Sequence, residues 1–268
     1  MEDAIELLIG IAKEIYSAIH PLLGTADAKK IVGLGFGGDK TRFIDAVAEK
    51  VVIERLEKNN FSCVFIGEEF GVRRIGSSPS FYLAVDGVDG TNNAIRGIRF
   101  ASASLALSRT EYLSDLEAAV VIDLYSGEIF SAERGLGAKC NGRIIRTSKQ
   151  RDLGNSIVSI NITKNIEAAR KLLPVIGKVK GVRAFGSAAL ETCHVACGLL
   201  EAYIDLRGVL RTIDFAAGML ILKEAGGVFL RSDGDDMMNV PLTEIRRFSI
   251  IASANKELLE KIVSLISS

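Results

Sequence analysis

Residues 83–93 read Leu-Ala-Val-Asp-Gly-Val-Asp-Gly-Thr-Asn-Asn, and the rest of the chain is organised around them. The apolar run from Phe81 to Val85 predicts a buried strand. Asp86 and Asp89 follow at the strand end, so a rigid element would display both carboxylates. Hard cations such as Mg²⁺ prefer oxygen ligands of this kind, together with water and phosphate. The alternative is a turn in which Asp and Gly serve only the backbone geometry. Two aspartates followed by Gly-Thr favour a site for metal and phosphate.

The residues behind these aspartates predict the start of a helix. Gly90, Thr91 and Asn92 follow the second carboxylate, and the free N–H groups at a helix start suit a phosphate. Gly87 and Gly90 allow the backbone to turn tightly and to approach a ligand closely. The stretch therefore combines candidate metal ligands with candidate phosphate donors.

The composition is that of a globular protein with one large domain or two smaller ones. The 268 residues are 48% hydrophobic and 25% charged, which excludes general disorder. Lys and Arg balance Asp and Glu, so no overall field favours nucleic acid or a membrane surface, and neither partner is expected. The apolar runs are too short for a transmembrane helix, and the acidic start at residues 1–3 lacks a signal-peptide pattern. We expect a cytoplasmic protein with free thiols.

The order of predicted elements divides the chain into two parts. The first part predicts helices and a run of adjacent, mostly antiparallel strands. Its helical spacing covers residues 3–19 and the segment after residue 41, and its strands lie at 62–66, 101–107, 118–122 and 128–132. In the second part strands alternate with helices, which is typical of an α/β arrangement. The strands lie at 156–160, 179–185, 202–206, 228–230 and 248–252, and the helices at 166–176, 187–199, 213–225 and 256–266. We predict an N-terminal α+β domain over residues 1–147 and a C-terminal α/β domain over 148–268.

Residues 33–38 match the pattern G-x-G-x-x-G, with a helical pattern after them. A dinucleotide-binding fingerprint needs a full strand before the glycines, and only Ile31 and Val32 are available here. The pattern favours a flexible loop that leads into a helix and can close over a site as a lid. Asp39 and Thr41 lie at or near the cap of that helix and are candidate lid residues. A non-catalytic nucleotide-binding domain that uses this loop is the alternative from a different class.

Further carboxylates occupy comparable positions elsewhere in the chain. The strand at 62–66 ends in Gly-Glu-Glu, and we expect one of Glu68 and Glu69 to point inward. Like charges near one another are costly unless a cation lies between them. Asp214 lies in the first turn of a helix, where it is either a cap or a ligand. Since the chain has only two histidines, a mechanism without a catalytic His is favoured.

Several strings occur in an order and spacing that resemble the inositol monophosphatase superfamily. They are Gly67-Glu68-Glu69, Asp86-x-Val88-Asp89-Gly90-Thr91, Gly186-Ser187-Ala188-Ala189, Ile213-Asp214-x-Ala216-Ala217-Gly218 and Glu224-Ala225-Gly226-Gly227. The short length and Arg207 look like the archaeal branch, which combines fructose-1,6-bisphosphatase and inositol-1-phosphatase activity. The resemblance implies an α+β fold, a layered αβαβα sandwich of the sugar phosphatase type. It also implies a metal-dependent phosphomonoesterase and, as is common in the family, a homodimer.

The resemblance further implies roles for individual residues. Two or three Mg²⁺ ions, for which Mn²⁺ can substitute, would be held by Glu69, Asp86, the carbonyl of Val88, Asp89 and Asp214. Glu69 and Thr91, with a metal, would activate the attacking water. Substrate contacts would come from Asp89, Gly90, Thr91, Arg183, Ala188 and Arg207. This agrees with the chemistry of phosphoryl transfer, which depends on positioning and charge stabilisation and needs no covalent nucleophile.

The substrate is expected to be a small phosphorylated sugar or inositol. Arg207 lies seven residues before Asp214, where inositol-selective relatives resemble one another in having a Glu. An Arg there could hold a second phosphate with both arms of its guanidinium, and Arg183 could act similarly. The alternative for Arg207 is a surface salt bridge. A nucleotide phosphatase acting on 3′-phosphoadenosine-5′-phosphate ranks lower, because aromatic residues that could stack on a base are only 6% of the chain.

Overall fold

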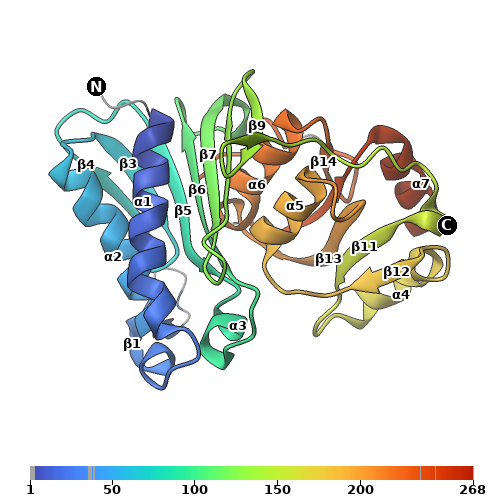
Figure 1. Cartoon of the computed structure of the whole chain (residues 1–268), viewed down its shortest axis with the longest axis horizontal. Coiled ribbons are helices and arrows are strands. Elements are labelled where there is room, and N and C mark those ends of the chain that lie inside the picture. The colour runs from blue at the N-terminus through green and yellow to red at the C-terminus, as the bar shows by residue number, and fades with distance from the viewer. Residues whose placement is uncertain (1–3, 36–37, 39, 236, 245, 268) are drawn as a thin grey trace.

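The computed structural model describes residues 4–35, 38, 40–235, 237–244 and 246–267. Helices and sheets alternate across the molecule as five layers (Figure 1). Two outer helices cover a large sheet, two inner helices separate it from a smaller sheet, and two more helices cover the far face. Three separate apolar cores fill the four spaces between the layers, the largest lying on both sides of the inner helices. The predicted αβαβα sandwich is therefore confirmed.

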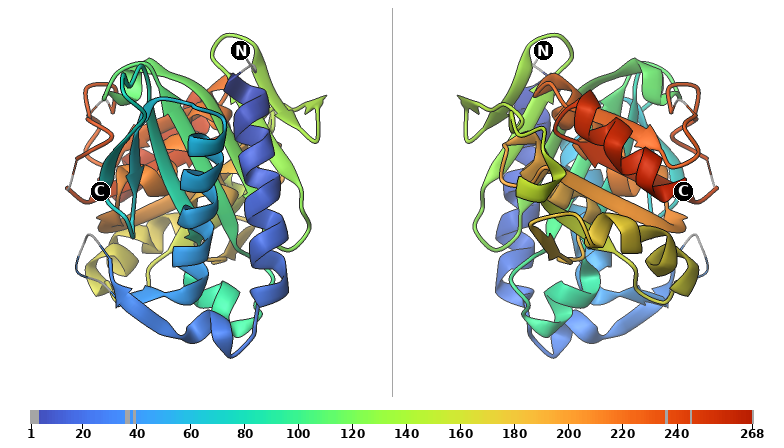
Figure 2. Two further views of the ribbon diagram at one scale, coloured as in Figure 1. Left: turned by 90° about the vertical axis from the view of Figure 1, so that its left-hand side faces the viewer. Right: turned by 90° about the vertical axis from the view of Figure 1, so that its right-hand side faces the viewer.

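The first layer consists of α1 (Ala4–Ile19) and α2 (Phe43–Lys58). Apolar residues of α1 recur every three or four positions, and this stripe is buried against the large sheet. Figure 2 shows the two helices lying side by side over that sheet. The predicted helix at residues 3–19 is confirmed over the described residues.

The large sheet has eight strands in the order β10-β9-β8-β7-β6-β5-β3-β4. Their bounds are β3 (Cys63–Gly67), β4 (Val72–Ile75), β5 (Tyr82–Asp89), β6 (Ser102–Ser108), β7 (Leu116–Asp123), β8 (Ile129–Glu133), β9 (Gly137–Cys140) and β10 (Arg143–Ile144). Strands β5 to β10 form an antiparallel meander, as the run of short strands predicted, whereas β3 and β5 are parallel. The short helix α3 (Thr91–Arg96) follows β5 directly, so the predicted helix start is confirmed.

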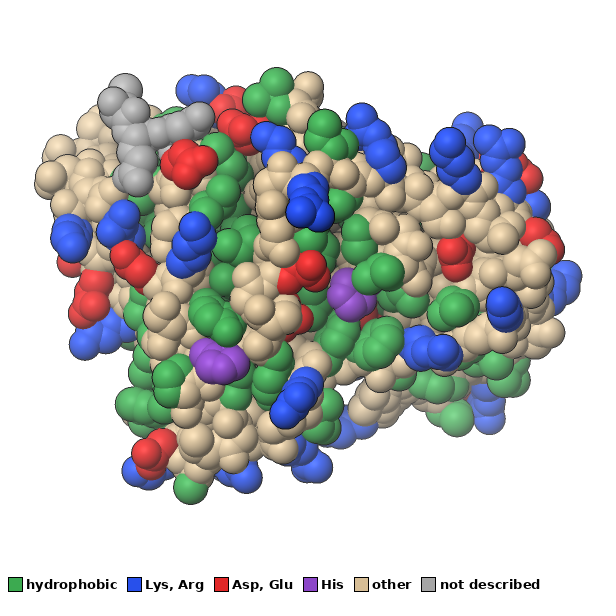
Figure 3. Space-filling view, viewed as in Figure 1, with side chains coloured by type: hydrophobic (Ala, Val, Ile, Leu, Met, Phe, Trp, Pro, Cys, Tyr) green, Lys and Arg blue, Asp and Glu red, His purple; other side chains and the backbone are tan. Residues whose placement is uncertain are grey.

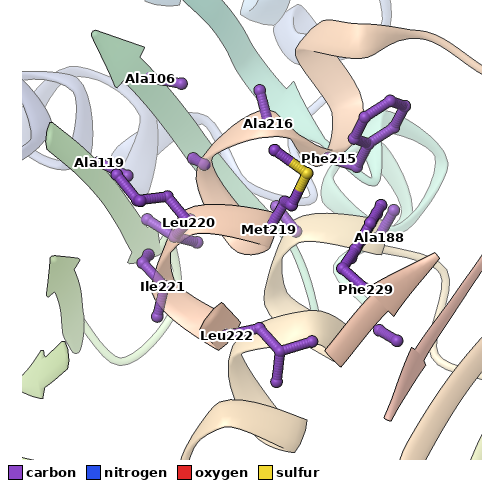
Figure 4. Packing of buried hydrophobic residues seen from close by; sticks show 14 of the residues in the cluster. Ala106, Ala119, Ala188, Phe215, Ala216, Met219, Leu220, Ile221, Leu222 and Phe229 are labelled. Carbon is purple, nitrogen blue, oxygen red and sulfur yellow. The ribbon is translucent and has the colours of Figure 1, made fainter. Parts of the chain in front are cut away.

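The inner layer consists of α5 (Ala188–Ala196) and α6 (Thr212–Glu224). Because sheets cover it on both sides, α6 is buried from Thr212 to Leu222 without a polar face. Small residues allow the two helices to approach each other: a Cβ on Gly218 would lie 3.0 Å from Cβ of Thr192. Figure 4 shows Leu220 of α6 pointing towards Ala119 of the large sheet.

The small sheet has the order β12-β11-β13-β15-β14. It comprises β11 (Ile157–Asn161), β12 (Gly181–Arg183), β13 (Ala202–Leu210), β14 (Val228–Arg231) and β15 (Phe248–Ser253), covered by α4 (Ile166–Ile176) and α7 (Lys256–Ile266). The strand predicted at 179–185 is shorter, because β12 is an edge strand that pairs with β11 over three residues only. The strand predicted at 202–206 is longer and continues to Leu210 past an irregularity in its pairing with β15.

The predicted division after residue 147 stays a prediction. The core around α5 and α6 mixes residues of both parts, among them Ala119 and Phe130 of the first and Phe215 of the second. Within the described residues, no helix combines the length and apolar character needed to cross a bilayer. On the face drawn in Figure 3, acidic and basic side chains are interspersed, in keeping with the balanced charge of the sequence.

The glycine-rich segment lies in a small separate ribbon. Strand β1 (Ile31–Leu34) pairs antiparallel with β2 (Lys40–Arg42), and β1 is exposed along its whole length. A dinucleotide-binding fingerprint requires a buried parallel strand at this position, so the ribbon does not have that architecture. Asp39, a predicted lid residue, lies outside the described residues.

Candidate active site

The ends of β3 and β5 bring together the acidic residues of two stretches, Glu68-Glu69 and Asp86-x-x-Asp89. In the parallel pair β3–β5, Gly67 lies beside Val85, so Glu68, just after β3, and Asp86, still within β5, lie at the same end of the two strands. The pairing of β5 with β6 is irregular between Asp86 and Asp89, which turns both side chains towards the second half of the molecule. Asp214 approaches from the first turn of α6. The structure thus gathers Glu68, Asp86, Asp89 and Asp214, which we call the carboxylate cluster.

Burial makes this cluster costly without a cation. Asp86 is 5% exposed and Asp89 is 9% exposed. Burial, and then repulsion by Asp89 and Asp214, raises the pKa of Asp86 well above its usual value. Burial raises the pKa of Asp89 to about 7, although hydrogen bonds from Ser187 and Ala189 oppose that shift. Burial also raises the pKa of Asp214. Such a cluster favours binding of positive charge.

Arg211 supplies a cation from the chain itself. Its Nη2 donates to Oε2 of Glu68 at 2.6 Å and to Oδ1 of Asp214 at 2.9 Å. The backbone N–H of Arg211 also donates to Oδ2 of Asp214 at 2.8 Å, which caps α6. The capping role that the sequence suggested for Asp214 therefore coexists with its place in the cluster. Arg211 was not singled out from the sequence, where only its spacing from Asp214 hints at it.

The two consecutive glutamates point to different places. Glu68 joins the cluster through Arg211, whereas a carboxylate oxygen of Glu69 accepts a hydrogen bond from the hydroxyl of Thr41, at the base of the ribbon. A Cβ on Gly35 would lie 2.6 Å from Oε2 of Glu69, so the ribbon passes directly over this side chain. The role of Glu69 as a metal ligand stays a prediction, and the geometry adds Glu68 as a candidate. Thr41, a predicted lid residue, is buried at this contact.

Glu49 of α2 holds the turn that carries both glutamates. Its Oε1 accepts from the N–H of Glu69 and its Oε2 from the N–H of Phe70, each at 2.9 Å. A Cβ on Gly67 would lie 2.5 Å from Oε2 of Glu49, so a larger residue there would displace this carboxylate. Burial raises the pKa of Glu49 to about 7. Glu49 was missed from the sequence, where it is one acidic residue within a helical pattern.

Thr91 lies at the start of α3 with a buried carboxyl as its neighbour. Its Oγ1 is 3.0 Å from Oδ1 of Asp45 and 3.0 Å from the carbonyl oxygen of Val88. Burial raises the pKa of Asp45 to about 7, against the hydrogen bond from Thr91. Asp45 was missed from the sequence because an Asp in the first turn of a helix is common for the helix dipole alone.

The turn at residues 185–187 closes the site from the second half. Gly90 has φ +91°, and a Cβ there would lie 2.9 Å from the carbonyl oxygen of Gly186, so the two segments touch. Oδ2 of Asp89 accepts from Oγ of Ser187 at 2.7 Å and from the N–H of Ala189 at 2.8 Å. Ala188, a predicted substrate contact, is buried between these two donors at the start of α5.

The two arginines predicted for a second phosphate are differently placed. Arg207 pairs with the fully buried Asp205, with Nε 2.9 Å from Oδ1 and Nη2 2.6 Å from Oδ2. The Nε and Nη2 side of its guanidinium is thus used within the chain, in a salt bridge as the alternative proposed, but to a buried rather than a surface partner. Arg183 is exposed, and its Nη1 donates to the carbonyl of Val182 at 2.9 Å. Their roles in substrate binding stay predictions.

The oxygen atoms of the carboxylate cluster suit a hard cation, although they do not converge on one point. Among the described residues, no three His, Cys, Asp or Glu converge closely enough to hold a metal ion. The cluster nevertheless offers oxygen atoms only, which suits Mg²⁺ rather than a soft metal. The guanidinium of Arg211 marks a place between Glu68 and Asp214 where positive charge is stable. A cavity of about 180 Å³, lined in part by Glu68 and Arg211, adjoins it.

Five alternating layers with a buried carboxylate cluster at the strand ends are the arrangement expected of the sugar phosphatase fold class. The model of the inositol monophosphatase family matches residues 2–268. A fructose-1,6-bisphosphatase/inositol-1-monophosphatase of Methanothermobacter thermautotrophicus is 34% identical over 95% of this chain and 93% of its own length. The chain therefore belongs to the inositol monophosphatase family.

Two further comparisons extend this result. A crystal structure described as an inositol monophosphatase–fructose 1,6-bisphosphatase matches with a TM-score of 0.86 and 31% identity, covering 98% of this chain and 99% of that one. A bifunctional NADP phosphatase/NAD kinase of Methanococcus maripaludis is 34% identical over 99% of this chain. The chain spans 50% of the length of that relative.

Proposed function

We propose that this phosphatase is Mg²⁺-dependent and hydrolyses fructose-1,6-bisphosphate, inositol-1-phosphate or both. The observation that carries the proposal is the convergence of Asp86, Asp89, Asp214 and Glu68 beside the hydrogen-bonded pair of Thr91 and Asp45. The relative from Methanothermobacter thermautotrophicus, with both activities in its name, supports the substrate class. We further propose a homodimer and Mn²⁺ as a substitute ion.

The cluster would hold the cation through Asp86, Asp89, Asp214 and one of Glu68 and Glu69. When bound, Mg²⁺ would offset the charge of the phosphate and make a water molecule more acidic. Arg211 must then exchange some of its hydrogen bonds to Glu68 and Asp214 for water or substrate, since the cation competes for the same oxygen atoms.

Thr91 and Asp45 would accept the proton that the attacking water loses. The Thr91 hydroxyl can accept a hydrogen bond from water while it donates to Oδ1 of Asp45. A carboxyl with a pKa of about 7 is well matched to accept a proton near neutral pH. The N–H groups at Gly90 and Thr91 would orient the phosphate at the start of α3. The chain's own residues thus position the phosphate and remove a proton.

A nucleotide phosphatase is the second candidate. The match to one half of a bifunctional NADP phosphatase/NAD kinase favours it. The cavity beside the cluster has apolar walls, including Ile66, Val72 and Leu242, which could cover part of a nucleoside. This candidate predicts turnover of a phosphorylated nucleotide in preference to a sugar phosphate.

A substrate panel decides between the two candidates. Phosphate release is measured from fructose-1,6-bisphosphate, inositol-1-phosphate, 3′-phosphoadenosine-5′-phosphate and NADP⁺ while Mg²⁺ is titrated. We expect Mg²⁺-dependent release from one or both of the first two substrates. Release from the nucleotides alone would replace the sugar phosphate assignment by the second candidate. No Mg²⁺-dependent release from any member would overturn the proposal.

A further inference from the structure

A second buried glutamate, Glu191, lies behind the active site and touches none of the predicted ligands. It is in the first turn of α5 and is 0% exposed. Its Oε1 accepts from the hydroxyl of Ser159 and from the N–H of Phe185, the latter at 3.2 Å. Its Oε2 accepts from the N–H groups of Gly186 and Ser187, each at 3.2 Å. Both oxygen atoms therefore act as acceptors, and three successive backbone N–H groups converge on one side chain.

The turn that Glu191 holds is the same turn that closes the site. Ser187 donates its hydroxyl to Oδ2 of Asp89, and Asn93 donates from Nδ2 to the carbonyl of Phe185 at 2.6 Å. A chain of contacts thus runs from Glu191 through the turn at 185–187 to Asp89. Asp89 belongs to the first half of the molecule and Glu191 to the second, so this chain also fixes one half against the other.

We propose that Glu191 is a positioning residue for the active site, which holds the turn at 185–187 so that Ser187 and Ala189 orient Asp89 towards the cation and the phosphate. The proposal rests on the proposed function and adds a residue that contacts neither metal nor substrate. Such residues behind a metal ligand commonly change metal affinity or activity about 10- to 100-fold when they are replaced.

The hydrogen bonds require a carboxylate at this position. Glutamine has the same size, but its amide nitrogen is a donor and would face either Phe185 N–H or the N–H groups of Gly186 and Ser187. Aspartate would keep the charge but is shorter by one methylene, so it cannot reach all three N–H groups. Glu191→Gln therefore disturbs the turn with the smallest change in volume.

Glu224 provides a matched control. Its two carboxylate oxygen atoms accept from the N–H groups of Gly135 and Gly137, each at 2.9 Å, so it also holds a turn. It lies at the far end of α6, ten residues or about 15 Å along the helix from Asp214. Glu224→Gln removes the same kind of contact without any link to Asp89.

The test compares the two variants in the full-length protein by Mn²⁺ binding, measured by calorimetry, and by kcat and KM. We expect Glu191→Gln to weaken Mn²⁺ binding and to lower kcat about 10-fold or more with little change in KM. We expect Glu224→Gln to behave as wild type in both measurements. Ser187→Ala removes the hydroxyl that reaches Asp89 and should reproduce part of the effect, so the proposal remains testable if Glu191→Gln does not fold.

The proposal is overturned if Glu191→Gln and Glu224→Gln have equal Mn²⁺ affinity and equal kcat. If Glu191→Gln does not fold, the same comparison is made between Ser187→Ala and Glu224→Gln. Wild-type protein that binds Mn²⁺ but releases no phosphate from any substrate would overturn the proposed function alone, because the Mn²⁺ affinities still decide on Glu191. If the wild-type protein binds no Mn²⁺, Mn²⁺ is not a substitute ion; Mg²⁺-dependent phosphate release then decides on the proposed function, and the kcat values of the variants decide on Glu191.

Discussion

The guanidinium of Arg211 is bound to Asp214, with Nη2 2.9 Å from Oδ1, in the first turn of the helix that carries this carboxylate into the site. The same guanidinium reaches Glu68. The molecule therefore stabilises part of its buried carboxylate cluster with a cation of its own. A divalent metal would compete with Arg211 for the same oxygen atoms, so metal binding and the Arg211 contacts are linked.

Replacing Arg211 should make the stability of the protein depend strongly on Mg²⁺. Without Mg²⁺, Arg211→Gln should lower the free energy of unfolding by about 2 kcal/mol, because buried carboxylates lose their counter-charge. The loss is smaller than for a fully buried pair, because the Arg211 side chain is 22% exposed and solvent screens its charge. Millimolar Mg²⁺ should restore most of this loss, since a bound ion stabilises the folded state. Urea unfolding with and without Mg²⁺ measures both quantities.

Arg207→Gln is the control for this comparison. It also breaks a pair with a buried aspartate, Asp205, that lies outside the carboxylate cluster. Its loss of stability should therefore be the same with and without Mg²⁺. If Mg²⁺ restores the free energy of unfolding of both variants equally, or of neither, the inference that Arg211 and the metal compete for the same oxygen atoms is wrong.

Thr91 and Asp45 should affect the rate more than substrate binding. Thr91→Val and Asp45→Asn should each lower kcat about 10²- to 10⁴-fold, the usual range for loss of a proton acceptor, with little change in KM. Thr91→Ser keeps the hydroxyl and should retain most of the activity. Steady-state kinetics with saturating Mg²⁺ measure these values, and a Thr91→Val enzyme as active as Thr91→Ser would contradict the role.

Local sequence patterns predicted the acidic residues of the carboxylate cluster that lie at the ends of regular elements. Asp86 and Asp89 follow the apolar run 81–85 and lie in the last part of β5, which is longer than predicted, and Asp214 opens an apolar helix, so each position could be inferred from a short window. The pattern could not decide between Glu68 and Glu69, because a shift of one residue at a strand end changes the direction of the side chain. Only the pairing of β3 with β5 places Glu68 beside Asp86.

The residues that were missed depend on contacts between distant segments. Glu49, Asp45 and Glu191 each lie in a helix, where a single acidic residue is unremarkable. Glu49 and Asp45 have partners 20 to 46 residues away, and Glu191 holds a turn 4 to 6 residues before it that contacts Asp89 about 100 residues away. Helices α4 and α7 were predicted with their observed bounds, because their amphipathic pattern is local. The bounds of the edge strand β12 were not, because its length depends on pairing with its neighbour β11.

His194 of α5 should make the folded state less stable in mild acid. Burial beside Phe100, whose ring centre is 5.3 Å away, lowers the pKa of His194, although Asp123 and Glu128 act in the opposite direction. The unfolded chain then binds a proton more readily, so the free energy of unfolding falls as pH drops below about 6.5. His194→Phe should reduce the difference in unfolding free energy between pH 7 and pH 5. An unchanged difference in urea unfolding would contradict this assignment.

Glu49 should support the metal site from the first half as Glu191 does from the second. It holds the turn at residues 68–70 through two backbone N–H groups, so Glu49→Gln should displace Glu68 and weaken Mn²⁺ binding about 10-fold. Glu201→Gln is the matched control, because Oε2 of Glu201 accepts from the N–H of Ile157 in the small sheet. Calorimetric titration with Mn²⁺ measures both affinities. If the two variants lose affinity equally, the effect comes from general destabilisation, whereas a loss confined to Glu49→Gln shows that the turn at 68–70 must be held for the cation to bind.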